Sequence, residues 1–129
     1  MRRGLHRMPW SAEINQDDQL IRRLSYYVHW RSAQIGRVKA ADVMGVHRDT
    51  CRRYSNYNFL QGEEPSICII ALNKLLRYFG DDLDKLFFAI RNSNDFYVFQ
   101  HILARTNLVA DVDRDGLADL IETSKRRVA

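Results

Sequence analysis

The chain has 129 residues, of which 46% are hydrophobic and 28% charged, so it is long enough to bury one ordinary globular core. The net charge of +4 is unevenly placed: residues 1–60 hold 11 Lys and Arg against 5 Asp and Glu, whereas residues 61–129 hold 9 against 11. Only two cysteines occur, which argues against a disulfide scaffold, and the basic first half is expected to attract a polyanion.

The location of the protein follows from its cysteines and its apolar runs. Cys51 and Cys68 form no CxxC pair, which argues against a zinc site and indicates a reducing compartment. Cys51 falls on the inner face of a predicted helix and Cys68 lies among isoleucines, so we expect both to be buried as small hydrophobes. No apolar stretch follows the basic residues near the N-terminus, and the run Ile67 to Leu72 is too short to span a bilayer. We therefore expect a cytoplasmic protein.

Apolar spacings of three and four dominate the chain and predict an all-α fold. The predicted helices run over residues 17–33, 38–44, 48–55, 66–78, a short stretch opened by Asp81 and Asp82, 95–108 and 117–127. In the first helix Leu20, Leu24, Tyr27 and Val28, and then Arg31, mark the helical spacing of the face expected to turn inward. Ser66 is the expected N-cap of the fourth helix, whose Ile69, Leu72, Leu75 and Leu76 are expected to face inward. Gly36, Gly45 and Gly80 are expected to end helices, and Asn56–Pro65 is predicted to be a loop.

The segment RVKAADVMGVHRDTCRRYSN, from Arg37 to Asn56, has the pattern of two short helices crossing at a steep angle. Ala41 is small enough to stand at the crossing, and Gly45 tolerates the positive φ that a tight turn requires. The apolar residues expected to bracket the crossing are Ala40, Met44, Val46, Cys51 and Tyr54. The polar residues His47, Arg48, Asp49, Arg52, Arg53 and Asn56 are then expected to face outward.

This segment resembles the helix-turn-helix of the lambda-repressor and Cro-type family. The continuation agrees: a loop with Pro65, the helix ICIIALNKLLRYFG and the sequence DDLDKLFF. The resemblance implies a five-helix DNA-binding domain at residues 17–90, after a basic N-terminal arm at 1–16. Residues 91–129 would be a C-terminal helical extension and a candidate dimerisation element. Arg37 stands where the family often has Gln, the loop Asn56–Pro65 is longer than usual, and the first helix is extended.

The resemblance also implies which side chains meet DNA. The expected base-edge contacts come from Arg48, Asp49, Arg52, Arg53 and Asn56, because an arginine fork matches the O6 and N7 atoms of guanine. The expected phosphate contacts come from Arg37, Lys39, His47 and the N-terminal Arg2, Arg3 and Arg7. We expect a homodimer on a palindromic operator, since one recognition helix spans only a few base pairs. Repression by occluding a promoter is the simplest outcome, and activation is equally consistent with the residues.

Other interpretations remain open. The helix-turn-helix could be vestigial in a protein-interaction module, antitoxin-like or a phage accessory protein, whose working surface is the acidic half at 61–129. Residues Asp111, Asp113, Asp115 and Glu122, with Gly116, satisfy the spacing of a calcium-binding EF-hand loop. No second loop exists to pair with it, so we prefer acidic capping of a helix N-terminus. No catalytic constellation stands out, and we expect neither enzymatic activity nor a cofactor.

Overall fold

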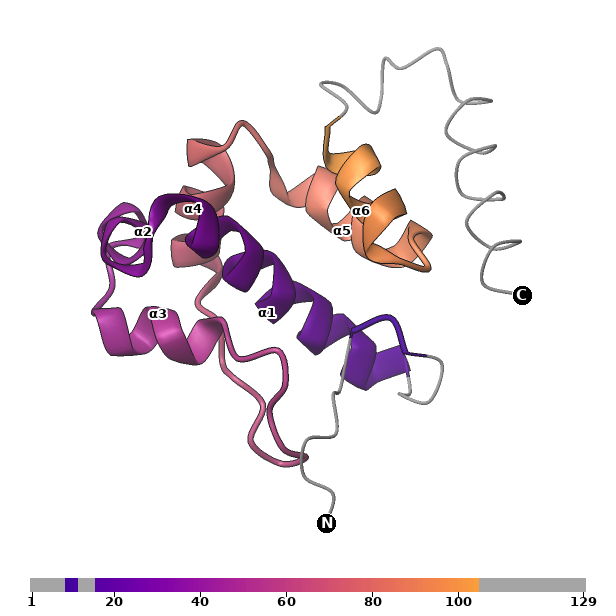
Figure 1. Cartoon of the computed structure of the whole chain (residues 1–129), viewed down its shortest axis with the longest axis horizontal. Helices are drawn as coiled ribbons and strands as arrows, with labels where there is room; N and C mark the ends of the chain where they lie inside the picture. Colours follow the sequence, from indigo (N-terminus) through magenta and orange to yellow (C-terminus); the bar gives the residue numbers. More distant parts are fainter. Residues whose placement is uncertain (1–8, 12–15, 105–129) are drawn as a thin grey trace. The chain divides into compact units, whose positions relative to one another are not determined.

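The computed structural model describes residues 9–11 and 16–104, and within them the chain forms six α-helices and no strand. The chain divides into two compact units, Met1–Phe79 and Gly80–Ala129. The helices of the first unit are α1 (Gln16–Ile35), α2 (Arg37–Met44), α3 (Arg48–Tyr54) and α4 (Ile69–Tyr78), and those of the second are α5 (Leu83–Asn92) and α6 (Phe96–Leu103) (Figure 1). The prediction of an all-α chain is confirmed for the described residues.

The first unit is built around α1, which contacts α2, α3 and α4. In Figure 1 α2 is seen nearly end-on while α3 lies across the view, so the two helices cross at a steep angle. The buried apolar side chains between these helices are Tyr27, Val28, Ala40, Ala41, Met44, Cys51, Tyr54, Ala71, Leu72, Leu75 and Leu76. Burial of this set supplies the main drive for folding, because each large apolar side chain contributes about 1.5–3 kcal/mol.

The inner face of α1 differs from its predicted pattern. Leu20, expected to face inward, is 40% exposed, whereas Arg22 is 1% exposed. The Arg22 guanidinium is satisfied on three sides: Nε donates to Asp18 Oδ2 at 2.7 Å, Nη1 donates to the Tyr57 carbonyl at 2.9 Å, and the group lies 3.8 Å from the centre of the Phe59 ring. A buried charge requires such compensation. Arg22 therefore attaches the loop after α3 to α1.

The start of α4 is a second correction. Ser66 is not its N-cap: the helix begins at Ile69, and Cys68 occupies the N-cap position with extended backbone angles. Ile69 consequently falls in the first turn and is 50% exposed, although Leu72, Leu75 and Leu76 are buried as predicted. The apolar run from Ile67 to Leu72 does not indicate the residue at which the helix begins. Ile67 precedes the helix, and its side chain is half-buried.

The second unit is a pair of helices with carboxylate N-caps. Asp82 accepts a hydrogen bond from the Lys85 backbone N–H at 2.8 Å, and Asp95 accepts one from the Val98 N–H at 2.9 Å. Each cap satisfies a backbone donor that the first helical turn leaves unpaired. The apolar faces that α5 and α6 bury hold Leu86, Ala89, Ile90, Val98, Phe99, Ile102 and Leu103. Helix α6 ends at Leu103, earlier than predicted, and the predicted helix at 117–127 lies outside the described residues.

None of the helices in the described part of the chain combines the length and the apolar composition that a membrane span requires.

Replacement of Arg22 tests the attachment of the loop to α1. We expect Arg22→Ala to lower the free energy of unfolding by about 3 kcal/mol, because it removes a buried guanidinium that binds the half-buried Asp18 carboxylate and the Tyr57 carbonyl. Urea denaturation followed by circular dichroism measures the change. The matched control is Arg37→Ala, at an exposed position, with an expected change below about 0.5 kcal/mol. Equal losses in the two variants would contradict the structural role of Arg22.

Candidate functional site

A tight turn joins α2 to α3. Gly45 follows the last residue of α2 with φ 71° and ψ 34°, in the left-handed region that favours glycine. Its N–H donates to the Asp42 carbonyl at 3.1 Å, and the Val46 N–H donates to the Ala41 carbonyl at 3.0 Å. These two bonds are those of a Schellman motif, which satisfies the last carbonyls of a helix and turns the chain away sharply. The positive φ expected at Gly45 is present.

The start of α3 is fixed by a histidine. His47 is its N-cap, and His47 Nδ1 accepts a hydrogen bond from the Asp49 backbone N–H at 3.1 Å. Because Nδ1 is the acceptor, the neutral ring carries its proton on Nε2. The His47 side chain is 69% exposed, so Nε2–H is a donor available to an outside acceptor. His47 therefore caps the helix and presents a hydrogen to solvent.

The inner faces of the two helices close on each other and on α1. Ala41, expected at the crossing, is 3% exposed, and Cys51 is fully buried, with its Sγ 3.7 Å from Ser32 Oγ of α1. Tyr54 is also buried, and Val46 in the turn is half-buried. A small residue at the crossing allows the helices to approach closely. The orientation of α3 is thus set by packing on one side.

The opposite face of α3 is polar and open to solvent. All six residues expected to face outward are exposed: His47, Arg48, Asp49, Arg52, Arg53 and Asn56. The Arg48 side chain makes no hydrogen bond or ion pair within the described part of the chain. Arg52 Nη2 lies 3.8 Å from Asp49 Oδ1, and Arg53 Nη2 donates to Thr50 Oγ1 at 3.3 Å. Such exposed contacts contribute little free energy, so three guanidinium groups remain available to a ligand.

Further positive charge lies on α2 and α4. Arg37 and Lys39 are exposed in the first turn of α2, and Gly36 before them forms no side-chain cap on that helix. Partial burial and, to a lesser extent, the Arg37 charge lower the pKa of His29. Lys74, which the sequence did not single out, is exposed on α4, and its Nζ lies 3.5 Å from where a β-carbon on Gly45 would stand. Lys74 comes near the turn because α4 packs beside α2, and the sequence pattern does not predict this contact.

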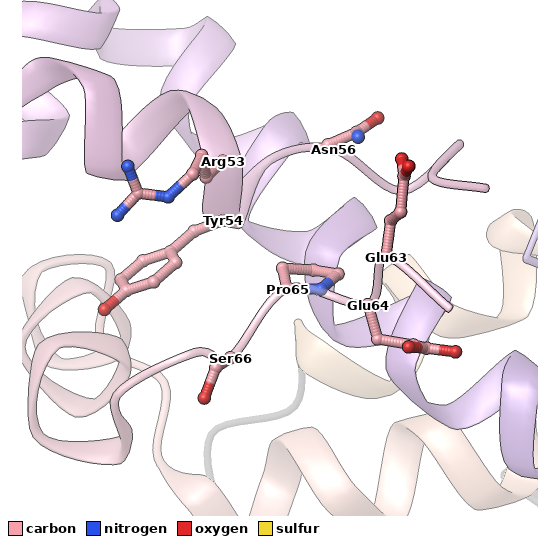
Figure 2. A pocket seen from close by; sticks show the side chains of 7 residues that line it. All are labelled: Arg53, Tyr54, Asn56, Glu63, Glu64, Pro65 and Ser66. Atoms are coloured by element: carbon pink, nitrogen blue, oxygen red, sulfur yellow. The ribbon is translucent and has the colours of Figure 1, made fainter. Parts of the chain in front are cut away.

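A hollow of about 310 Å³ adjoins the end of α3 (Figure 2). From the helix and the residues after it, Arg53, Tyr54 and Asn56 line one side. The returning loop lines the other side with Glu63, Glu64, Pro65 and Ser66. Arg53 and Asn56, which the sequence predicted to contact DNA bases, therefore line the same hollow as the carboxylates of Glu63 and Glu64. The sequence analysis did not predict that these two glutamates lie near α3.

Several expected residues lie outside the described part of the chain. They are the N-terminal Arg2, Arg3 and Arg7 and the calcium-loop residues Asp111, Asp113, Asp115 and Glu122. Among the residues that the structure describes, no group of three or more His, Cys, Asp or Glu side chains is arranged to hold a metal ion.

The two cysteines occupy different environments. Cys51 is buried as expected, but Cys68 is exposed, which corrects the expectation that both are buried. Cys68 precedes α4 as its N-cap, and the backbone N–H groups of Ala71 and Ile70 lower the pKa of its thiol because they stabilise the thiolate. The isoleucines around Cys68 predicted that its side chain is buried, but at the N-cap of α4 the side chain is open to solvent.

Comparison with known proteins gives no relative: no protein family, curated protein or solved structure matches this chain.

The turn at Gly45 is tested by two substitutions. A β-carbon there meets only ordinary contact distances, so any cost of Gly45→Ala arises from the backbone conformation. We expect Gly45→Ala to lower the free energy of unfolding by about 1–2 kcal/mol, and Gly45→Asn to cost less, because Asn tolerates left-handed angles better. Urea titrations of both variants measure this. Unchanged stability in Gly45→Ala would show that the left-handed turn does not form.

The thiols are tested by reaction with Ellman's reagent. In the native protein we expect one thiol, that of Cys68, to react quickly, and Cys51 to react only after unfolding in guanidinium chloride. Because its pKa is lowered, Cys68 should retain its reactivity at a lower pH than a cysteine in an unfolded peptide does. The variant Cys68→Ser should lose the fast reaction. Two fast thiols in the native protein would contradict the burial of Cys51.

Proposed function

We propose that this protein is a sequence-specific DNA-binding regulator that places α3 in the major groove of double-stranded DNA. The observation that carries the proposal is the outward face of α3, where Arg48, Arg52 and Arg53 are exposed on a helix whose other face is buried. The major groove accepts an α-helix, and an arginine fork there pairs with guanine O6 and N7. In the proposal Asp49 and Asn56 read neighbouring base edges.

The proposed docking also uses the charges around α3. Arg37 and Lys39 at the start of α2, and Lys74 beside the turn, would contact phosphates on the flanking strand. The start of α2 has no side-chain cap, so its first backbone N–H groups would serve the same purpose. The Nε2–H of His47 supplies one more donor. In the proposal, helices α1 to α5 correspond to the five helices of the lambda-repressor and Cro-type family.

The proposed active form is a cytoplasmic homodimer that represses transcription from a palindromic operator. Dimerisation through the C-terminal helices would place two copies of α3 about one helical turn of DNA apart. Both cysteines are free thiols, which is consistent with a reducing compartment. The proposal needs no cofactor.

A second candidate is a protein-interaction module. Its support is the first turn of α4, where Ile69 and Ile70 are 50% and 65% exposed. Adjacent exposed isoleucines are a feature of partner-binding surfaces, although single exposed apolar residues are common. This candidate predicts that the protein does not bind DNA even at low salt.

DNA binding is tested with fluorescently labelled duplexes and paired variants. We expect a random 30-base-pair duplex to bind at about 50 mM salt and to lose affinity steeply as salt rises, because bound phosphates release counterions. Selection from a random pool should enrich an inverted repeat. Arg52→Ala plus Arg53→Ala should remove that preference, since each base contact contributes about 1–3 kcal/mol.

The control for this pair is Arg77→Ala plus Arg91→Ala, which removes the same charge from exposed positions outside α3. It should weaken binding slightly and keep the enriched sequence. A wild-type protein that binds no duplex at low salt, or a control that loses preference as the α3 pair does, would contradict the proposal.

A further inference from the structure

The loop between α3 and α4 is anchored to α1 and passes the C-terminal end of α3. Arg22 binds the Tyr57 carbonyl and covers the Phe59 ring, and Phe59 is 1% exposed. Beyond this anchor the loop reverses direction: the Glu63 N–H donates to the Leu60 carbonyl at 2.9 Å, and Gly62 adopts φ 88°. A loop with a buried anchor and a hydrogen-bonded reversal presents its side chains at defined positions.

The two glutamates after this reversal differ in their contacts. Glu64 Oε2 accepts a hydrogen bond from the Gly62 N–H at 3.2 Å, so its carboxylate serves the turn itself. Glu63, one residue earlier, makes no side-chain hydrogen bond or ion pair within the part of the chain that the structure describes. Both line the hollow at the end of α3 (Figure 2). Glu63 is therefore the carboxylate whose acceptors remain open there.

A free carboxylate in the same hollow as Arg53 and Asn56 has a defined effect on a nucleic-acid ligand. It repels phosphate oxygens, and it accepts a hydrogen bond from an amino group. In the major groove the amino donors are cytosine N4 and adenine N6, and carboxylates pair with cytosine N4. The side chains that share the hollow, Arg53 and Asn56, are proposed base readers, so a base edge beside them would come within reach of Glu63.

We propose that Glu63 is a specificity-determining residue that accepts a hydrogen bond from cytosine N4 at one base pair of each half-site. This inference rests on the proposed function, because it requires α3 to lie in the major groove. Glu63 and Glu64 together also weaken binding to DNA of the wrong sequence, since their charges oppose the phosphates that the arginines attract.

The test compares Glu63→Ala with Glu64→Gln, which removes the same charge from the next residue and keeps an acceptor for the Gly62 N–H. The probes are the duplex enriched by selection, the same duplex with the cytosine position changed to each other base, and a random 30-base-pair duplex. The wild type should discriminate against the changed base about tenfold. Glu63→Ala should lose this discrimination and Glu64→Gln should keep it, while both variants bind the random duplex a few-fold more tightly.

The outcomes separate the two claims. If the wild type binds the enriched duplex specifically but Glu63→Ala still discriminates at every position, the role of Glu63 is overturned and the proposed function stands. If both variants lose discrimination equally, the loop acts through its shape, and the reading by Glu63 is overturned as well. If the wild type binds neither duplex, the proposed function fails, and this inference fails with it. Thermal unfolding of both variants confirms that each is folded.

Discussion

The geometry of the site depends on one backbone constraint, the left-handed conformation of Gly45. With φ 71° the chain closes α2 by a Schellman motif and turns toward α3 within a few residues. This turn allows Ala41 of α2 and Cys51 of α3 to be buried in the same core. The burial of one side of α3 then leaves its arginines on the other side. The exposed charge is thus a consequence of how the turn directs the helix.

A second constraint fixes what lies next to the arginines. Arg22 is buried on α1, paired with Asp18, and bound to the Tyr57 carbonyl of the loop after α3. Removing a guanidinium from water costs several kcal/mol, and this cost is offset only if all its partners stay in place. The loop therefore keeps a defined path that brings its glutamates to the hollow at the end of α3. The exposed basic face of α3 therefore has two carboxylates, those of Glu63 and Glu64, in the hollow at its end.

The sequence predicted those parts of the structure that depend on local chemistry. Glycine at a turn, aspartates at helix starts and the apolar spacing of α2 and α3 each act within a few residues, so the turn at Gly45 and the outward arginines followed from pattern alone. The sequence pattern did not predict the environment of residues whose contacts come from distant parts of the chain. Arg22 is buried because Phe59 and Tyr57 reach it, and Lys74 meets the turn because α4 packs beside α2. Cys68 and Ile69 are exposed because α4 begins later than its apolar run indicates.

The most direct test of major-groove docking by α3 is methylation interference on the duplex enriched by selection. Dimethyl sulfate places a methyl group on guanine N7 in the major groove and on adenine N3 in the minor groove. If the arginines of α3 read guanine, N7 methylation at one or two guanines of each half-site should abolish binding, while adenine N3 methylation there should have little effect. Interference confined to adenine N3, or none at any guanine, would contradict the assignment of α3 as the helix that reads DNA.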